Sequence, residues 1–138
     1  MSKSADAGLE ALFAAAKAAR ERAYAPYSRF SVGAAIRAPS GAIYSGCNVE
    51  NAAYPQGACA EAGAISAMAL AGERRIVDIV VVGDGEDLCT PCGGCRQRIR
   101  EFADAKTRVH GAGLGGVRAS FALEDLLPHS FGPGHLGR

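Results

Sequence analysis

The sequence predicts a three-layer α/β/α fold, in which a mixed five-stranded sheet carries helices on both faces. Three observations point to this class. Five short β-prone segments and four helical ones follow one another along the chain. Residues 76–82 are β-branched almost throughout, which is typical of a central strand buried on both faces. Six residues separate the last two strands, too few for a parallel crossover, so this pair is predicted to be antiparallel.

The first part of the chain predicts a helix followed by a hairpin. Residues 6–24 are rich in alanine and place apolar side chains at helical spacing. Residues 30–36 and 42–46 are β-prone and flank a proline- and glycine-containing turn, which indicates two antiparallel strands. Residues 47–57 are polar and irregular, so we expect a loop of the kind that often carries ligand contacts.

The second part predicts two helices on either side of the buried strand. Residues 59–71 favour a helix that ends at Gly72. Pro91 suits a first helical turn, which predicts a helix over 92–103. The remaining predicted elements are strands at 107–110 and 117–121, a short helix at 123–127, and a glycine-rich tail at 131–138 on the surface or against a partner.

Composition limits the classes of function. The 138 residues are 49% hydrophobic and 21% charged, which fits a single domain over residues 1–138. A net charge of +1 gives little support for nucleic-acid binding, and no apolar run has transmembrane length, so we expect neither nucleic acid nor membrane as a partner. Five cysteines, an odd number without a disulfide pattern, favour a reducing compartment, and we expect a cytoplasmic protein.

Two cysteine motifs indicate a metal site with chemistry. Cys59 and Glu61 are separated by one residue, and Cys92 and Cys95 follow Pro91 about thirty residues later. Three thiolates with a fourth position left to water are typical of a catalytic zinc site, and a carboxylate beside that position can move protons. Cys89 leaves an alternative open, because a fourth cysteine ligand would close a purely structural zinc site.

The same motifs resemble those of the zinc-dependent nucleoside deaminases, whose chemistry is known in general terms. The likeness narrows to the small homotetrameric cytidine deaminases and runs from about residue 24 to residue 136. It is carried by three further segments: YSRFSVGAA at 27–35, GCNVENAAY at 46–54 and LLPHSF at 126–131.

The resemblance implies a cytidine deaminase-like fold, a homotetramer, and one Zn²⁺ per chain bound by Cys59, Cys92 and Cys95. It implies hydrolysis of cytidine and deoxycytidine to uridine and deoxyuridine with release of ammonia, as in pyrimidine salvage. In the implied mechanism, zinc-bound hydroxide attacks C4 and Glu61 shuttles the protons. The implied nucleoside contacts are Phe30, Asn48, Glu50 and the Ala60 backbone, with Ala52, Tyr54 and Phe131 reaching a neighbouring subunit's site.

One departure from the resemblance concerns the charge of the metal site. Relatives often carry arginine directly after the glutamate, where it donates to the zinc-bound sulfurs, but Ala62 stands here. The helix starts, Arg96 or Gln97 are candidates to supply the positive charge. We expect Arg96, Arg98 and Arg100 otherwise to form a solvated helix face. Two alternatives remain at this point: a deaminase of another small aminated heterocycle or nucleoside antibiotic, and a non-catalytic structural zinc module.

Overall fold

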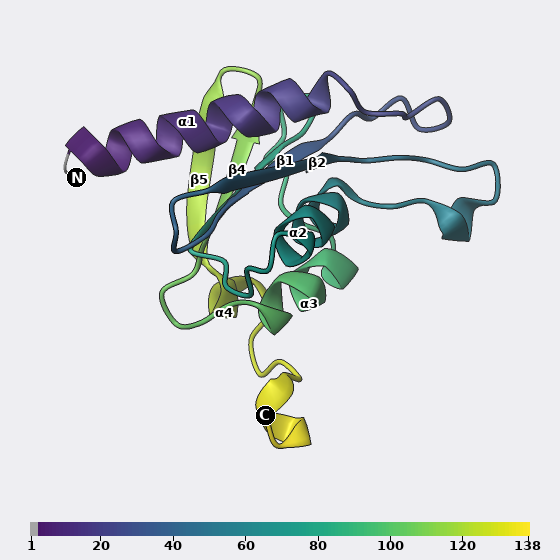
Figure 1. Ribbon diagram of the computed structural model, residues 1–138. Coiled ribbons are helices and arrows are strands. Elements are labelled where there is room, and N and C mark those ends of the chain that lie inside the picture. The colour runs from purple at the N-terminus through teal and green to yellow at the C-terminus, as the bar shows by residue number, and fades with distance from the viewer. Residues whose placement is uncertain (1–2) are drawn as a thin grey trace.

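The computed structural model describes residues 3–138 and contains a mixed five-stranded sheet (Figure 1). The sheet order is β2-β1-β3-β4-β5. Strands β3 and β4 are parallel, whereas β1 pairs antiparallel with both β2 and β3, and β4 pairs antiparallel with β5. The predicted hairpin and the predicted antiparallel last pair are confirmed. The strands are β1 (Gly33–Arg37), β2 (Ile43–Cys47), β3 (Asp78–Val82), β4 (Arg108–Gly113) and β5 (Gly116–Ala122).

Helices cover both faces of this sheet, which confirms the three-layer prediction. In Figure 1, α1 lies across one face, and α2 and α3 lie side by side against the other. No helix within residues 3–138 combines the length and the apolar character needed to cross a membrane. The helical elements are α1 (Lys3–Arg20), α2 (Ala60–Leu70), α3 (Gly93–Glu101), α4 (Leu123–Leu126), and the 3-10 turns η1 (Tyr54–Gln56) and η2 (Pro133–Leu136).

Strand β3 is the centre of the core, as its sequence predicts. All five of its residues are buried. Successive side chains of a strand point to opposite faces, so Val80 packs with the α1 side of the core and Ile79 with the α2 side. A side chain at Gly33 would overlap the α1 backbone at Ala16, so this glycine lets α1 lie directly on β1. Two apolar clusters therefore fix the helical layers to the sheet.

The first helix ends earlier than predicted, at Arg20 instead of Tyr24. Tyr24 instead joins the loop that follows β2. Its N–H donates to the carbonyl of Asn48 at 3.0 Å, and its carbonyl accepts the N–H of Glu50 at 2.8 Å. These bonds replace the helical ones, so residues 21–32 form a connection that runs beside the loop at 48–50.

Residues 30–32 lie outside the strand that was predicted to begin at Phe30, and β1 begins at Gly33. A side chain holds this segment instead of a strand ladder. The Asn48 amide accepts the Val32 N–H at 2.8 Å and donates to the Phe30 carbonyl at 2.8 Å. The segment is thereby fixed at the edge of the sheet without belonging to it.

Other boundaries differ by a few residues. Strand β4 continues to Gly113, so the predicted six-residue connection is a tight turn that Gly116 completes with φ of +143°. Helix α2 ends as predicted, because Gly72 has φ of +89° and donates to the carbonyl of Ala69. The tail extends away from the sheet in Figure 1, with the Leu136 side chain exposed, in agreement with the predicted surface tail.

Candidate metal centre and active site

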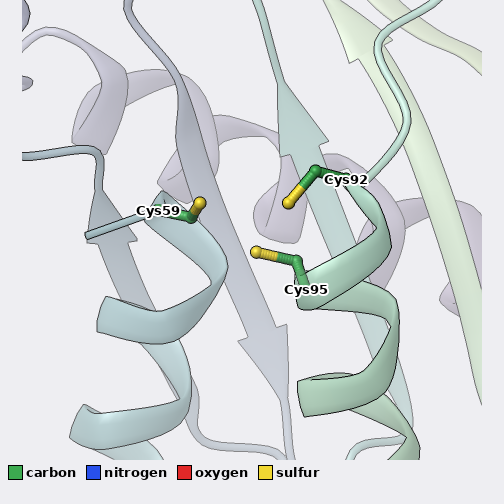
Figure 2. A group of neighbouring side chains, drawn as sticks. All are labelled: Cys59, Cys92 and Cys95. Atoms are coloured by element: carbon green, nitrogen blue, oxygen red, sulfur yellow. The ribbon is translucent and has the colours of Figure 1, made fainter. Parts of the chain in front are cut away.

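Three cysteine sulfurs from two helix starts converge on one point. Cys59 directly precedes α2, and Cys92 and Cys95 belong to the start of α3. The side chains point toward one another across the space between the helices (Figure 2). Their Sγ atoms all lie within 4.8 Å of one another. The structure thus brings together the three residues predicted to bind the metal.

This group fits zinc. A tetrahedral zinc with Zn–S bonds of about 2.3 Å holds its sulfurs about 3.8 Å apart, which the observed spacing can accommodate with small side-chain adjustments. Thiolates are ligands that Zn²⁺ prefers, and three of them leave one corner of the tetrahedron. Cys89 is not part of this group, so the described cysteines assemble a three-sulfur site and not a four-sulfur one.

The helix starts explain why the sulfurs are available. Cys59 and Cys92 are the N-cap residues of α2 and α3, and neither helix has a side-chain hydrogen bond at its cap. The free N–H groups of a first helical turn favour a nearby anion. The Cys95 backbone N–H, the largest cause, lowers the pKa of the Cys92 thiol. Burial instead raises the pKa of Cys59 and of Cys95, so a bound cation is needed to keep these two thiols ionised.

Glu61 lies in the first turn of α2 and is buried, with 4% of its surface exposed. Burial raises the pKa of its carboxyl group, although its own backbone N–H, the Cys95 thiol and the Arg98 guanidinium oppose the shift. Among residues 3–138, the ion pairs of the protein do not include Glu61. A raised pKa means that this carboxyl group binds a proton more readily than an exposed one, which suits a group that transfers protons.

A cavity of about 190 Å³ joins Glu61 to most of the predicted nucleoside contacts. Cys59 and Cys92 line it from the starts of α2 and α3, and Phe30 and Asn48 line it from the segments beside β1 and β2. Cys89 and Thr90 approach from the loop before α3. The lining residues predicted from the sequence are Phe30, Asn48, Cys59, Ala60, Glu61 and Cys92.

Glu50 lines a neighbouring cavity of about 330 Å³, together with Tyr27, Ser28 and Tyr54. One carboxylate oxygen of Glu50 accepts the N–H groups of Tyr27 at 2.9 Å and Ser28 at 3.1 Å, and the other accepts the Ser28 hydroxyl. The Ser28 hydroxyl is the largest cause that lowers the pKa of Glu50. Glu50 is therefore a charged residue, fixed by the segment that leads to Phe30.

The three residues predicted to reach a neighbouring subunit are exposed in the single chain. Ala52 and Tyr54 lie on the loop that projects to one side in Figure 1, and Phe131 lies at the start of the tail. The side chains of Tyr54 and Phe131 are 75% and 57% exposed. The Phe131 carbonyl accepts the Gln97 amide at 2.8 Å, which ties the tail to α3 near the metal ligands.

Of the three arginines predicted to form a solvated face, Arg98 is exposed, whereas Arg96 and Arg100 are partly buried. Arg96 donates to the carbonyls of Pro91 at 2.7 Å and Leu126 at 2.8 Å, and to the Thr90 hydroxyl at 3.0 Å. Arg100 donates to the Ser130 hydroxyl, also at 2.8 Å. These two long side chains donate to two carbonyls and two hydroxyls, so the prediction of a solvated face is wrong for Arg96 and Arg100 and holds for Arg98.

Sequence reasoning also missed Arg98, whose Nη1 donates to the Cys95 Sγ at 3.5 Å. The spacing of Cys95 and Arg98 could have indicated this contact, because residues three apart are neighbours on a helix. It missed Asp84 as well, which follows β3. Asp84 pairs with Arg20 and accepts the Ser31 N–H at 3.0 Å, so it holds the Phe30 segment from the other side. This contact joins parts of the chain far apart in sequence, and no local pattern announces it.

Comparison with known proteins agrees with this site. Residues 7–111 match the family described as the cytidine and deoxycytidylate deaminase zinc-binding region. A cytidine deaminase of Sporosarcina psychrophila is 44% identical over 89% of this chain and 90% of its own. The crystal structure of cytidine deaminase from Burkholderia pseudomallei superposes with a TM-score of 0.83 at 45% identity, covering 88% of this chain and 98% of that chain.

A second crystal structure, of cytidine deaminase from Mycobacterium tuberculosis, gives a TM-score of 0.76 at 36% identity over 89% of this chain and 96% of that one. The family region, residues 7–111, includes strands β1 to β3, the two helix starts and the three cysteines whose sulfurs converge. The chain therefore belongs to the zinc-binding cytidine and deoxycytidylate deaminase family.

Proposed function

We propose that this protein hydrolyses cytidine and deoxycytidine to uridine and deoxyuridine, with release of ammonia. The observation that carries the proposal is the joint presence, around one cavity, of the zinc ligands Cys59 and Cys92 and the buried Glu61. Relatives named cytidine deaminase that match most of the chain support the substrate. The net charge of +1 favours a free nucleoside over a polynucleotide.

Zinc bound by Cys59, Cys92 and Cys95 would supply a Lewis acid that activates water near neutral pH. Glu61 then carries two protons in turn. The first moves from the attacking water to the ring nitrogen N3, and the second moves from the new C4 hydroxyl to the amino group, which leaves as ammonia. The raised pKa of Glu61, caused mainly by burial, suits both directions of transfer.

The nucleoside would lie between Phe30 and the start of α2. An aromatic ring such as Phe30 can cover an apolar face, and the free backbone groups of Ala60 in the first turn can bond the base edge. Asn48 uses one amide hydrogen on Phe30, which leaves a second for a ribose oxygen. Glu50 keeps acceptor capacity on the oxygen that the Ser28 hydroxyl occupies, so it can accept a ribose hydroxyl.

The proposal is tested by the ultraviolet absorbance change when the purified protein is mixed with cytidine. Zinc-loaded protein should convert cytidine, a chelator should abolish the conversion, and added zinc should restore it. A zinc-loaded and folded protein without activity on cytidine or deoxycytidine would overturn the proposal and favour another aminated heterocycle as substrate.

We also propose that the site is completed in a homotetramer, with Ala52, Tyr54 and Phe131 contributed to a neighbouring subunit. Support comes from the exposure of the two rings, since large apolar side chains in water are typical of interfaces.

The five cysteines are free, and we propose a reducing, cytoplasmic location on that ground.

Complementation between subunits tests the shared site. Glu61→Gln subunits have no proton shuttle but carry an intact Phe131, and Phe131→Ala subunits have the reverse defect. Co-expressed hybrids should be more active than the sum of the two variants, because some sites regain both groups. Light scattering gives the oligomer size. A monomer, or hybrids no better than that sum, would contradict the shared site.

A further inference from the structure

The metal centre needs positive charge from somewhere other than the residue after Glu61. Zn²⁺ with three thiolates carries a formal charge of −1, and the Glu61 carboxylate adds to the negative potential when it is ionised. The two residues after Glu61 are Ala62 and Gly63, which carry no charge. Groups around the ligands of a metal site tune both the affinity for the metal and its chemistry, so the source of the compensating charge is a functional question.

Arg98 is placed to supply it. It lies one turn after Cys95 on α3, and its Nη1 donates to the Cys95 Sγ at 3.5 Å. To reach the sulfur, the side chain folds back toward the start of the helix and passes over Gly94. A Cβ at Gly94 would lie in ordinary contact with the same Nη1, at 3.4 Å, so the guanidinium lies close to the backbone of the first helical turn.

The two other side chains that the sequence offers as sources of compensating charge, Arg96 and Gln97, donate their hydrogen bonds elsewhere. All three guanidinium nitrogens of Arg96 donate to Pro91, Thr90 and Leu126. The Gln97 amide donates to the Phe131 carbonyl. Within residues 3–138, Arg98 is the charged side chain that donates a hydrogen bond to one of the three converging sulfurs.

We propose that Arg98 is a positioning residue that donates to the Cys95 thiolate and offsets the negative charge of the zinc site, replacing the arginine that is absent at Ala62. A charged hydrogen bond to the sulfur withdraws electron density from it, which keeps the thiolate bound as an anion and makes the metal a stronger Lewis acid. The inference rests on the zinc site and on the deaminase activity proposed above.

The test measures metal binding as well as the reaction rate. Arg98→Met removes the charge and the donor but keeps an unbranched side chain, and Arg98→Lys keeps the charge. Zinc affinity is measured by competition with a chromophoric chelator, and Co²⁺ is used as a probe of the thiolate bonds through its sulfur-to-metal absorption band. Arg108→Met, at an exposed position of β4, removes the same charge away from the site.

Arg98→Met should weaken zinc binding by about 10- to 100-fold and shift the cobalt–sulfur band to lower energy. Arg98→Lys should recover part of both changes, and Arg108→Met should show neither. Unchanged affinity and an unchanged band in Arg98→Met would overturn the proposal, as would equal effects in Arg108→Met. These readouts do not depend on turnover, so an inactive wild-type protein with an Arg98-dependent metal site would overturn the proposed substrate alone.

Discussion

Two buried carboxylates on opposite faces of the sheet have opposite surroundings. Asp78, at the start of β3 on the α1 side, is 8% exposed, and Glu61, on the α2 side, is 4% exposed. Asp78 is paired with Arg37, and its other oxygen bonds the His110 Nε2 at 2.8 Å. His110 in turn bonds the Ser120 hydroxyl at 2.7 Å. Glu61 has no such partners among the described ion pairs.

The pKa values of these two carboxyl groups are shifted in opposite directions. Burial alone would raise the pKa of Asp78, but hydrogen bonds from His110 and Arg37 outweigh burial and leave the pKa lowered. At Glu61 burial prevails and the pKa is raised. A buried carboxylate with bonded partners contributes to structure, whereas one left without an ion pair is typical of a catalytic group. Partners, more than burial, therefore distinguish the two roles.

The largest effect that would sharpen this contrast is expected from Glu61→Gln. The amide cannot move protons, so the deamination rate should fall by at least about 10²- to 10⁴-fold. Zinc content should remain one ion per chain, and the free energy of unfolding should not fall, because no ion pair is lost. Initial rates, metal analysis and denaturant unfolding measure the three quantities. A loss of zinc or of stability comparable to the loss of rate would place Glu61 with Asp78 as a structural residue.

Asp78→Ala should lower the stability of the protein and leave the deamination rate unchanged. It leaves His110 and Arg37 without their acceptor, and breaking a buried pair costs about 3–5 kcal/mol. Arg37 keeps contact with water, its side chain being 38% exposed, so we expect a loss of about 2–3 kcal/mol in the free energy of unfolding. The rate per folded molecule should stay unchanged. Glu124→Ala, at an exposed position, is the control for loss of one negative charge. A stability equal to that of the control would contradict the structural role.

A smaller effect is expected from acid. The lowered pKa of Asp78 means that the unfolded chain takes up a proton first as pH falls, so the contribution of Asp78 is complete above the unfolded value of about 3.9 and is lost as pH falls through the folded value. The difference in unfolding free energy between the wild type and Asp78→Asn should be constant near neutral pH and shrink below about pH 4. Unfolding curves at a series of pH values measure it, and a difference that grows in acid would reverse the sign.

The smallest effect is expected from Cys89→Ser. Cys89 lines the same cavity as Glu61 but lies outside the three-sulfur group. The variant should retain both zinc and deamination. If the serine variant instead released zinc, Cys89 would be a fourth ligand, the site would be a closed structural one, and Glu61 would lose its proposed role.

The sequence predicted the parts of the fold that depend on short-range patterns. The β-branched run at 76–82 and Pro91 before α3 were sufficient to predict a central strand and a helix start. The end of α1 was missed because Tyr24 bonds to the loop at residues 48–50, a contact between segments that no local propensity reveals. The same reason explains the shortened β1, whose expected first residues are held by the Asn48 side chain.

The site divides in the same way. Spacing alone grouped Cys59, Cys92 and Cys95, which the structure brings together. The contribution of Asp84 was not found, because it acts through partners far away in the sequence, Arg20 and Ser31. The role of Arg98 could have been inferred from its three-residue distance to Cys95, but a run of alternating arginines is more often solvent-facing.

The cysteine N-caps of α2 and α3 have a mechanical consequence. Serine, threonine, aspartate or asparagine usually closes a helix start at this position with a side-chain oxygen, and neither helix has such a bond. A shared metal ion would link two short helices whose first turns lack side-chain caps, and it would close the loop of chain between them as a cross-link does. The stability of this helical layer and the activity of the site would then depend on the same three sulfur atoms.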